Sequence, residues 1–228
     1  RRRAGAPGAG VPGRGLEVNA GPDRRPDWLR WAQRVQAIAQ TGLTYASDPY
    51  DRERYEELRG IAVAMTSGAL AVPPEEVRVA FASGLGYPTP KVDVRAVVFR
   101  GDELLLVRER RSGRWTFPGG WADAGDTPSR AAERETLEES GYRVKAGKVL
   151  ALLDKSRHEH PVSVDYTYKV LMGCQLEGGE PVTSHEIDAV GFFARDARPA
   201  LDLERTTPRQ IELAWAHLAD PSRPTDFD

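Results

Sequence analysis

Residues 119–142 read GGWADAGDTPSRAAERETLEESGY, and this stretch decides how the rest of the chain is interpreted. Thr127 is a favourable helix N-cap, Pro128 suits the first helical position, and Gly141 suits the residue that follows a helix. The pattern therefore predicts a helix over residues 127–140.

Three carboxylates share one face of that predicted helix. Glu135, Glu138 and Glu139 are three or four residues apart, so they are neighbours on a helix surface. Like charges at this spacing repel each other by roughly 0.2–0.5 kcal/mol per pair. Mg²⁺ or Mn²⁺ would relieve this repulsion, because hard cations take oxygen ligands and keep waters and substrate phosphates in the remaining positions. A solvated acidic face is the alternative for such a helix taken alone.

The whole stretch resembles the Nudix box, in which a glycine is followed at fixed spacings by Glu, Arg-Glu, Glu-Glu and a second glycine. The matching residues are Gly120, Arg134, Glu135, Glu138, Glu139, Gly141 and Tyr142. Asp126 stands where the family has Glu, and Thr136 stands at an apolar position of the pattern. Asp126 keeps the charge but has a shorter reach, so we expect it only to support the site.

The resemblance implies an enzyme that hydrolyses a nucleoside diphosphate linked to a further group, with Mg²⁺ or Mn²⁺ as cofactor and water as the attacking group. It also implies the metal ligands, which are Glu135, Glu138 and Glu139 together with a backbone carbonyl near Gly119 or Gly120. Glycines at these two positions let the backbone approach a bound group closely.

The remaining catalytic residues implied by the resemblance are Arg134, which orients a box glutamate by an ion pair, and a general base that varies within the family. Glu186 precedes a predicted strand where family members often carry a catalytic acid, and a plain loop acid is an equal alternative. The candidate substrate-binding residues are Arg108, Arg110, Arg114, Lys155, Arg157 and His158. Simple solvation is the alternative for these basic residues.

Hydrophobic periodicity outside the box predicts a mixed fold. Helices are predicted over 28–42, ending at Gly42, over 49–68, over 73–81 and over 207–218, and strands over 92–98, 104–107, 115–117, 144–153, 162–176 and 190–193. The expected class is α+β: a Nudix α/β/α sandwich with a mixed sheet, preceded by a small helical module. The expected boundaries are a disordered tail at 1–26, the helical module at 27–86, the Nudix domain at 87–220 and a C-terminal tail at 221–228.

The segments before the box refine the resemblance. Residues 39–45 and 48–58 look like the helical domain that precedes one Nudix subgroup, often labelled ADP-ribose pyrophosphatase, which includes CDP-choline pyrophosphatases. A proline typical of true ADP-ribose pyrophosphatases is missing at its spacing beyond the box, which favours CDP-choline-like substrates over ADP-ribose. RNA ends and oxidised nucleotides are further candidates. A Nudix-fold nucleotide sensor without activity is the rival from another class, and the intact box argues against it.

Composition limits the partners. The 228 residues carry 32 basic and 34 acidic side chains, for a net charge of -2, which does not favour a nucleic-acid or anionic-membrane binder. The single cysteine, Cys174, excludes an internal disulfide. No apolar run is long enough to span a membrane, so we expect a cytoplasmic protein. Since two or three short helices make a poor core alone, we expect a homodimer in which the helical module forms part of the interface.

Overall fold

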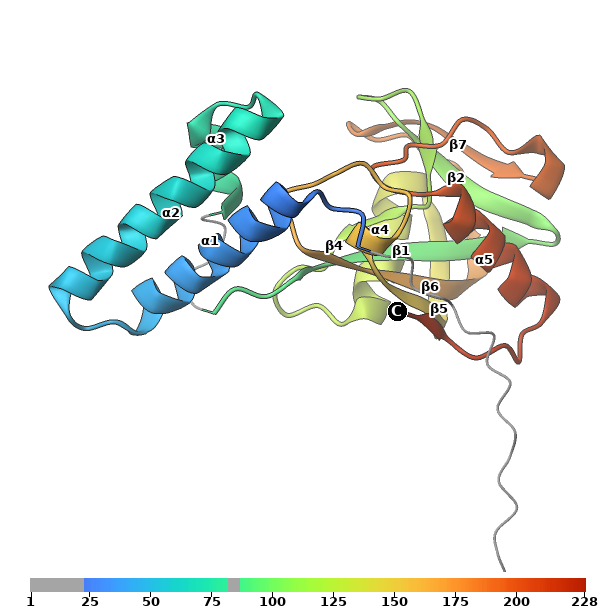
Figure 1. Ribbon diagram of the computed structural model, residues 1–228. Helices are drawn as coiled ribbons and strands as arrows, with labels where there is room; N and C mark the ends of the chain where they lie inside the picture. Colours follow the sequence, from blue (N-terminus) through green and yellow to red (C-terminus); the bar gives the residue numbers. More distant parts are fainter. Residues whose placement is uncertain (1–22, 82–86) are drawn as a thin grey trace, which may run out of the picture.

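The computed structural model describes residues 23–81 and 87–228. Nearly all of the predicted N-terminal tail therefore lies outside the described residues. Figure 1 shows the first three helices standing to one side of a domain built on a sheet, in the order that the hydrophobic patterns predict.

The helical module consists of α1 (Asp27–Tyr45), α2 (Pro49–Leu70) and α3 (Pro74–Phe81). Asp48 caps α2, because its side chain accepts hydrogen bonds from the backbone N–H groups at the start of that helix. Gly42 does not end α1 as predicted. It lies inside the helix because the ring of Tyr55 on α2 packs against it: a Cβ at Gly42 would lie 2.4 Å from that ring.

The second domain contains an eight-stranded mixed sheet. Its strands are β1 (Lys91–Arg100), β2 (Glu103–Glu109), β3 (Trp115–Thr116), β4 (Gly119–Trp121), β5 (Tyr142–Asp154), β6 (Thr167–Gly179), β7 (Ile187–Phe193) and β8 (Asp226–Phe227). The main path runs β3-β2-β1-β6-β5-β8, while β4 also pairs with β1 and β7 with β2. The pairing of β1 with β6 is parallel, whereas β1 is antiparallel to β2 and β4.

Two cores lie on the two faces of this sheet, which confirms the expected α+β sandwich. On one face, Ala131 and Ala132 of α4 (Pro128–Ser140) pack with Val94 and Ala96 of β1. On the other face, α5 (Pro208–Ala219) packs on Val97 and its neighbours, with Trp215 of α5 against Phe99 at 4.8 Å between ring centroids. The alternation of side chains along β1 is what separates the two cores.

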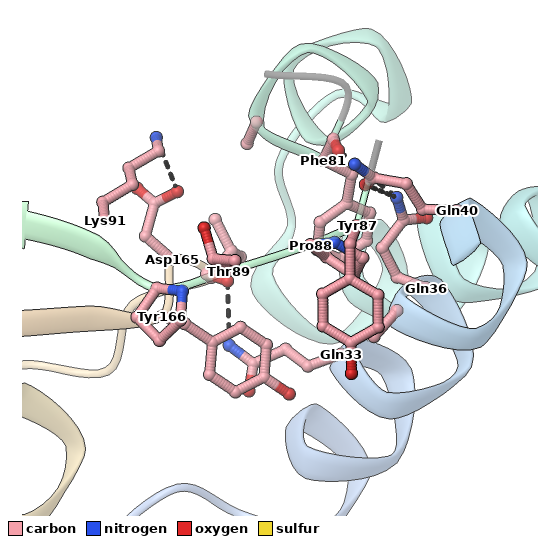
Figure 2. A pocket seen from close by; sticks show the side chains of 14 residues that line it. Gln33, Gln36, Gln40, Phe81, Tyr87, Pro88, Thr89, Lys91, Asp165 and Tyr166 are labelled. Carbon is pink, nitrogen blue, oxygen red and sulfur yellow. Dashed lines mark hydrogen bonds and ion pairs between the residues drawn. The ribbon is translucent and has the colours of Figure 1, made fainter. Parts of the chain in front are cut away.

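The helical module contacts the sheet domain through α1 (Figure 2). Gln33 of α1 is 1% exposed, and its side-chain amide donates to the carbonyl of Val164 at 2.8 Å. Residues 162–166 therefore form a loop against α1, and β6 begins at Thr167 rather than at residue 162 as predicted. A cavity of about 320 Å³ lies beside this contact, and the Lys91–Asp165 ion pair of 2.9 Å is on its wall.

The segment predicted as a C-terminal tail contains a short strand that contacts the domain. β8 pairs in parallel with β5, and Asp226 is 4% exposed with its carboxylate 2.9 Å from Nε2 of His217. The side chain of Asp228 accepts the backbone N–H of Asp154 at 2.6 Å. Among the described residues, no helix combines the length and the apolar character that crossing a bilayer requires.

Candidate active site

Helix α4 forms as its sequence predicts. Thr127 accepts the backbone N–H of Arg130 at 3.2 Å, Pro128 occupies the first turn, and Gly141 closes the helix in the left-handed region at φ 76°. The helix packs beside β4, so the face that carries Glu135, Glu138 and Glu139 meets the Gly-Gly strand. The two parts of the box are thereby brought together in space.

Both glycines of β4 have close contacts, and those of Gly119 leave no room for a side chain. A Cβ at Gly119, where φ is 137°, would lie 2.1 Å from the carbonyl oxygen of Val94. A Cβ at Gly120 would lie 3.2 Å from the carboxylate of Glu135. The backbone N–H of Gly119 donates to Oε2 of Glu139 at 2.7 Å. Gly119 therefore tolerates no side chain, and a side chain at Gly120 would require the carboxylate of Glu135 to shift.

These residues line a cavity of about 800 Å³. Its wall consists of Asp93, Arg95, Gly119, Gly120, Trp121, Asp123, Glu135, Glu138, Glu139, Lys155, Ser184, His185, Glu186, Glu204 and Arg205. Seven of these are acids and three are lysine or arginine, so the cavity carries an excess of negative charge. A polyanion such as a diphosphate would enter this cavity only if additional cations offset that charge.

Burial controls the charge state of two of the acids. Glu139 is 6% exposed, and loss of solvation raises its pKa to about 7, although the charge of Arg95 and the N–H of Gly119 act in the opposite direction. Loss of solvation also raises the pKa of Glu135, with Arg134 opposing it. A carboxylate that loses its hydration in this way is stabilised by a nearby cation.

The predicted residues divide into two groups. Seven of them line the cavity: Gly119, Gly120, Glu135, Glu138, Glu139, Lys155 and Glu186. Arg134 lies beside them, with Nη1 2.9 Å from Glu135, 3.1 Å from Glu138 and its Nη2 3.2 Å from Asp126. The ion pair expected between Arg134 and a box glutamate is therefore present.

The other predicted substrate contacts do not line the cavity. Arg108 pairs with Asp188 at 2.7 Å, Arg110 donates to the carbonyl of Ser184 at 3.1 Å, and Arg114 is exposed at the turn before β3. His158 is 3% exposed, with its ring 3.0 Å from the carboxylate of Asp228. Arg157 lies in the short 3₁₀ helix Lys155–Arg157, of which only Lys155 faces the cavity.

Sequence reasoning missed several residues of the cavity wall. Asp93 and Arg95 come from β1, and Glu204 and Arg205 from the segment before α5. The first pair leaves a signal, because two charges interrupt an otherwise apolar strand and are 6% and 3% exposed. For the second pair, the residue types alone assign no role, since a charged loop is common in any chain.

The donor set fits a hard divalent cation. Glu135, Glu138 and Glu139 offer carboxylate oxygens, and the Gly-Gly strand offers backbone carbonyls beside them. Within the described residues, no three His, Cys, Asp or Glu side chains already stand in a metal-binding group. Arg134 contacts Glu135 and Glu138, and the N–H of Gly119 is bound to Glu139.

Two family descriptions match this chain. Residues 89–213 match the NUDIX domain, and residues 26–81 match the UDP-X-like, N-terminal oligomerisation domain. The first match covers the sheet domain and the cavity described above. The second covers the helical module.

Similar proteins agree with these matches. A Bacillus subtilis protein named "Putative ADP-ribose pyrophosphatase YjhB" is 39% identical over 201 residues, covering 88% of this chain and 97% of the relative. A crystal structure of UDP-X diphosphatase is 35% identical with a TM-score of 0.58, covering 89% of this chain and 98% of that one. An ADP-ribose pyrophosphatase from Streptococcus suis is 38% identical with a TM-score of 0.57, covering 61% of this chain and 100% of that one.

The family resemblance seen in residues 119–142 is thus confirmed over both domains. The chain belongs to the Nudix hydrolase family.

Proposed function

We propose that this protein hydrolyses the pyrophosphate bond of nucleoside diphosphate derivatives, with ADP-ribose as the first substrate to test. The observation that carries the proposal is the meeting of Glu135, Glu138 and Glu139 with the Gly119-Gly120 backbone in one acidic cavity. ADP-ribose comes first because the names of the Bacillus subtilis and Streptococcus suis relatives contain it. CDP-choline is the second substrate to test, because the sequence favours it. A UDP-linked compound is the third, because a UDP-X diphosphatase is a structural neighbour.

The residues that would hold Mg²⁺ or Mn²⁺ are Glu135, Glu138 and Glu139, with a backbone carbonyl of Gly119 or Gly120. The cation would neutralise phosphate charge and lower the pKa of a bound water. The N–H of Gly119 fixes the carboxylate of Glu139 so that one oxygen remains for the cavity. The glycines keep side chains out of the space that the diphosphate needs.

Arg134 and Glu186 supply the other parts of the proposed site. Arg134 ties Glu135 and Glu138 to Asp126, and so orients the acidic face of α4. Glu186 lines the cavity on the loop before β7, 57% exposed and 3.3 Å from the ring of His185. We assign Glu186 as the candidate general base, because it can take a proton from an attacking water in the cavity.

Metal removal tests the function directly. We expect hydrolysis of ADP-ribose with Mg²⁺ or Mn²⁺ and its loss in EDTA, with full recovery when either cation is restored in excess. The measurement is product release from ADP-ribose, CDP-choline, a UDP-sugar and an oxidised nucleotide, each with and without metal. Binding of a nucleotide with no turnover of any compound would instead favour the nucleotide sensor.

Substitution of Asp126 tests whether the departure from the Nudix box matters. The carboxylate of Asp126 lies 3.2 Å from Arg134 and 3.7 Å from Arg130, its side chain is 14% exposed, and it does not line the cavity. The side chain in Asp126→Glu keeps the charge and can still reach Arg134, so we expect turnover within about twofold of wild type. A large loss of turnover in a folded variant would show that the short carboxylate is itself required.

We also propose that the protein is a homodimer through its helical module. The description matched by residues 26–81 is that of an oligomerisation domain, and the module exposes bulky apolar residues. These are Trp31, Ile38, Tyr45, Tyr50, Ile61 and Val79, which are 45–72% exposed. We expect the mass of a dimer by light scattering at micromolar concentration, and a monomer there would contradict the interface.

A further inference from the structure

The basic side chains that line the acidic cavity are Arg95, Lys155 and Arg205, and they differ in the partners that their nitrogen atoms already have. Arg95 is 3% exposed, and it donates from Nε to Asp93 at 2.7 Å and from Nη1 to the carbonyl of Phe117 at 3.2 Å. Nζ of Lys155 lies 3.6 Å from Glu204. Arg205 forms an ion pair with Glu109, in which Nε lies 3.0 Å from Oε1, and its side chain is 36% exposed.

Arg205 therefore has two terminal nitrogens to offer. Neither Nη1 nor Nη2 of Arg205 has a hydrogen-bond partner in the described part of the chain, and the residue lines the cavity. A guanidinium held at Nε presents its outer edge as a planar fork, which matches two oxygens of one phosphate.

The segment that carries Arg205 is firmly anchored. The backbone N–H of Arg205 donates to the carbonyl of Asp202 at 3.0 Å. The hydroxyl of Thr206 lies 2.8 Å from that of Thr116 and accepts the backbone N–H of Phe117 at 3.2 Å. Thr207 begins α5 with a capping box. Arg205 is thus fixed against the short strand that leads into Gly119, which places it at the same cavity as the Gly-Gly turn.

Glu109 lies behind the arginine at the end of β2. It is 4% exposed, and the nitrogen of Arg205 approaches it as an ion pair rather than as an aligned hydrogen bond. Burial raises the pKa of Glu109, while the positive charges of Arg205 and Arg95 lower it. A buried acid that does not line the cavity yet pairs with a cavity arginine acts on the cavity through that arginine.

We propose that Arg205 binds the diphosphate of the substrate, and that Glu109 is the positioning residue that fixes its guanidinium; this inference rests on the proposed function. The ligand class is a diphosphate ester, bound by a fork of two N–H groups to non-bridging oxygens of one phosphate. Arg205 and the carboxylates of α4 line the same cavity from different elements, so each can contact a different part of the diphosphate. Removing it takes away binding in the ground state and in the transition state alike.

The test compares Arg205→Ala, Arg205→Lys and Glu109→Gln in the full chain. The matched control is Arg195→Ala, which removes an exposed arginine paired with Glu212 at 2.6 Å outside the cavity. Kinetics with ADP-ribose and Mg²⁺ are measured beside calorimetric binding of α,β-methylene-ADP, which cannot be cleaved at its phosphates. Arg205→Lys guards against a folding defect because it keeps the charge opposite Glu109.

We expect Arg205→Ala to lower kcat/KM and analogue affinity by about 10- to 100-fold, which is the effect of hydrogen bonds to a charged group. Most of the loss should be in KM, with a smaller loss in Arg205→Lys and none in Arg195→Ala. Glu109→Gln should lower the affinity for the analogue in the wild-type background. In the Arg205→Ala background it should lower that affinity little further. An equal loss in both backgrounds would overturn the positioning role.

The two readouts separate this inference from the proposed function. If wild type binds the analogue through Arg205 but cleaves no compound, the proposed hydrolysis fails and the phosphate contact stands. If wild type cleaves ADP-ribose while Arg205→Ala keeps its kcat/KM and analogue affinity, the inference is overturned and the hydrolysis stands. Absence of analogue binding by wild type would overturn the assignment of Arg205.

Discussion

Glu139→Gln should lower turnover by at least about 10²- to 10³-fold, the loss typical of removing one electrostatic stabiliser from an active site. The expectation follows from the position of Glu139, which is 6% exposed between the Gly119 N–H and the acidic cavity. The amide oxygen of Gln can still accept that N–H, so the local geometry is kept. What disappears is the negative charge that a divalent cation needs.

The same change should not weaken the fold. Burial raises the pKa of Glu139 to about 7, so ionising this carboxylate destabilises the folded chain. The neutral amide of Gln has no such destabilising effect. The melting temperature of Glu139→Gln without metal is therefore expected to be equal to or above that of wild type.

A matched control lies on the same helix. Glu133 accepts the backbone N–H of Ala146 at 3.0 Å and pairs with Lys145, outside the cavity. Glu133→Gln is expected to keep wild-type turnover with ADP-ribose and Mg²⁺. A fully active, metal-independent Glu139→Gln protein would remove the basis for placing the cation at α4.

The box could be predicted from sequence because its parts are close along the chain. Caps at Thr127 and Gly141 define α4, and helical spacing then fixes the shared face of the glutamates without knowledge of the fold. The alternation of apolar residues in the strands similarly predicts the sandwich, since each face of the sheet needs its own core.

The rest of the site depends on contacts between distant segments. Arg205 reaches the cavity through Thr206, whose hydroxyl bonds to Thr116 some ninety residues earlier, and no local pattern encodes that contact. The error over Gly42 has the same origin. Glycine often ends a helix, but at position 42 it makes room inside α1 for the ring of Tyr55 of α2. The loop at 162–166 likewise follows from the hydrogen bond that Gln33 makes to it.

The arginines predicted to bind substrate make contacts that proximity in sequence does not reveal. Arg108 and Arg110 precede the Gly-Gly turn by about ten residues, and their partners are Asp188 and the carbonyl of Ser184 near the start of β7. They hold the loop that carries Glu186: the backbone N–H of Arg110 also donates to the carbonyl of Glu186 at 2.7 Å. These contacts connect both arginines to the segment that carries Glu186, and their contact with substrate stays a prediction.

The second large effect is expected from Asp93→Asn and concerns the free energy of unfolding. Asp93 lies between Arg95, at 2.7 Å, and the ammonium of Lys169, and these two cations are 3% and 0% exposed. Asp93→Asn keeps the size of the side chain but leaves two buried cations without their counter-charge. Breaking a buried pair in this way costs about 3–5 kcal/mol, which for a chain of this size lowers the melting temperature by roughly 6–20 °C.

The surface offers a control for this change. Asp51 pairs with Arg54 at 2.7 Å, and both side chains are more than half exposed. Asp51→Asn should therefore stay within about 0.5 kcal/mol of wild type in urea unfolding. If Asp93→Asn unfolds at the same urea concentration as Asp51→Asn, the buried charges do not stabilise the strand as the contacts indicate.

The dependence on pH separates the lost charge from a simple packing defect. Burial alone would raise the pKa of Asp93, but Arg95 and Lys169 outweigh it and lower the pKa to about 2. Because the folded value lies below the unfolded value of about 3.9, the stabilisation is complete well above pH 4 and is lost as the pH falls towards 2. The stability gap between wild type and Asp93→Asn should thus be constant from pH 6 to 7 and should narrow at pH 3, where about half of this linkage contribution remains. A gap that keeps its full size at pH 3 would mean that the carboxylate acts through its shape, since protonated Asp and Asn are both neutral beside the same two cations.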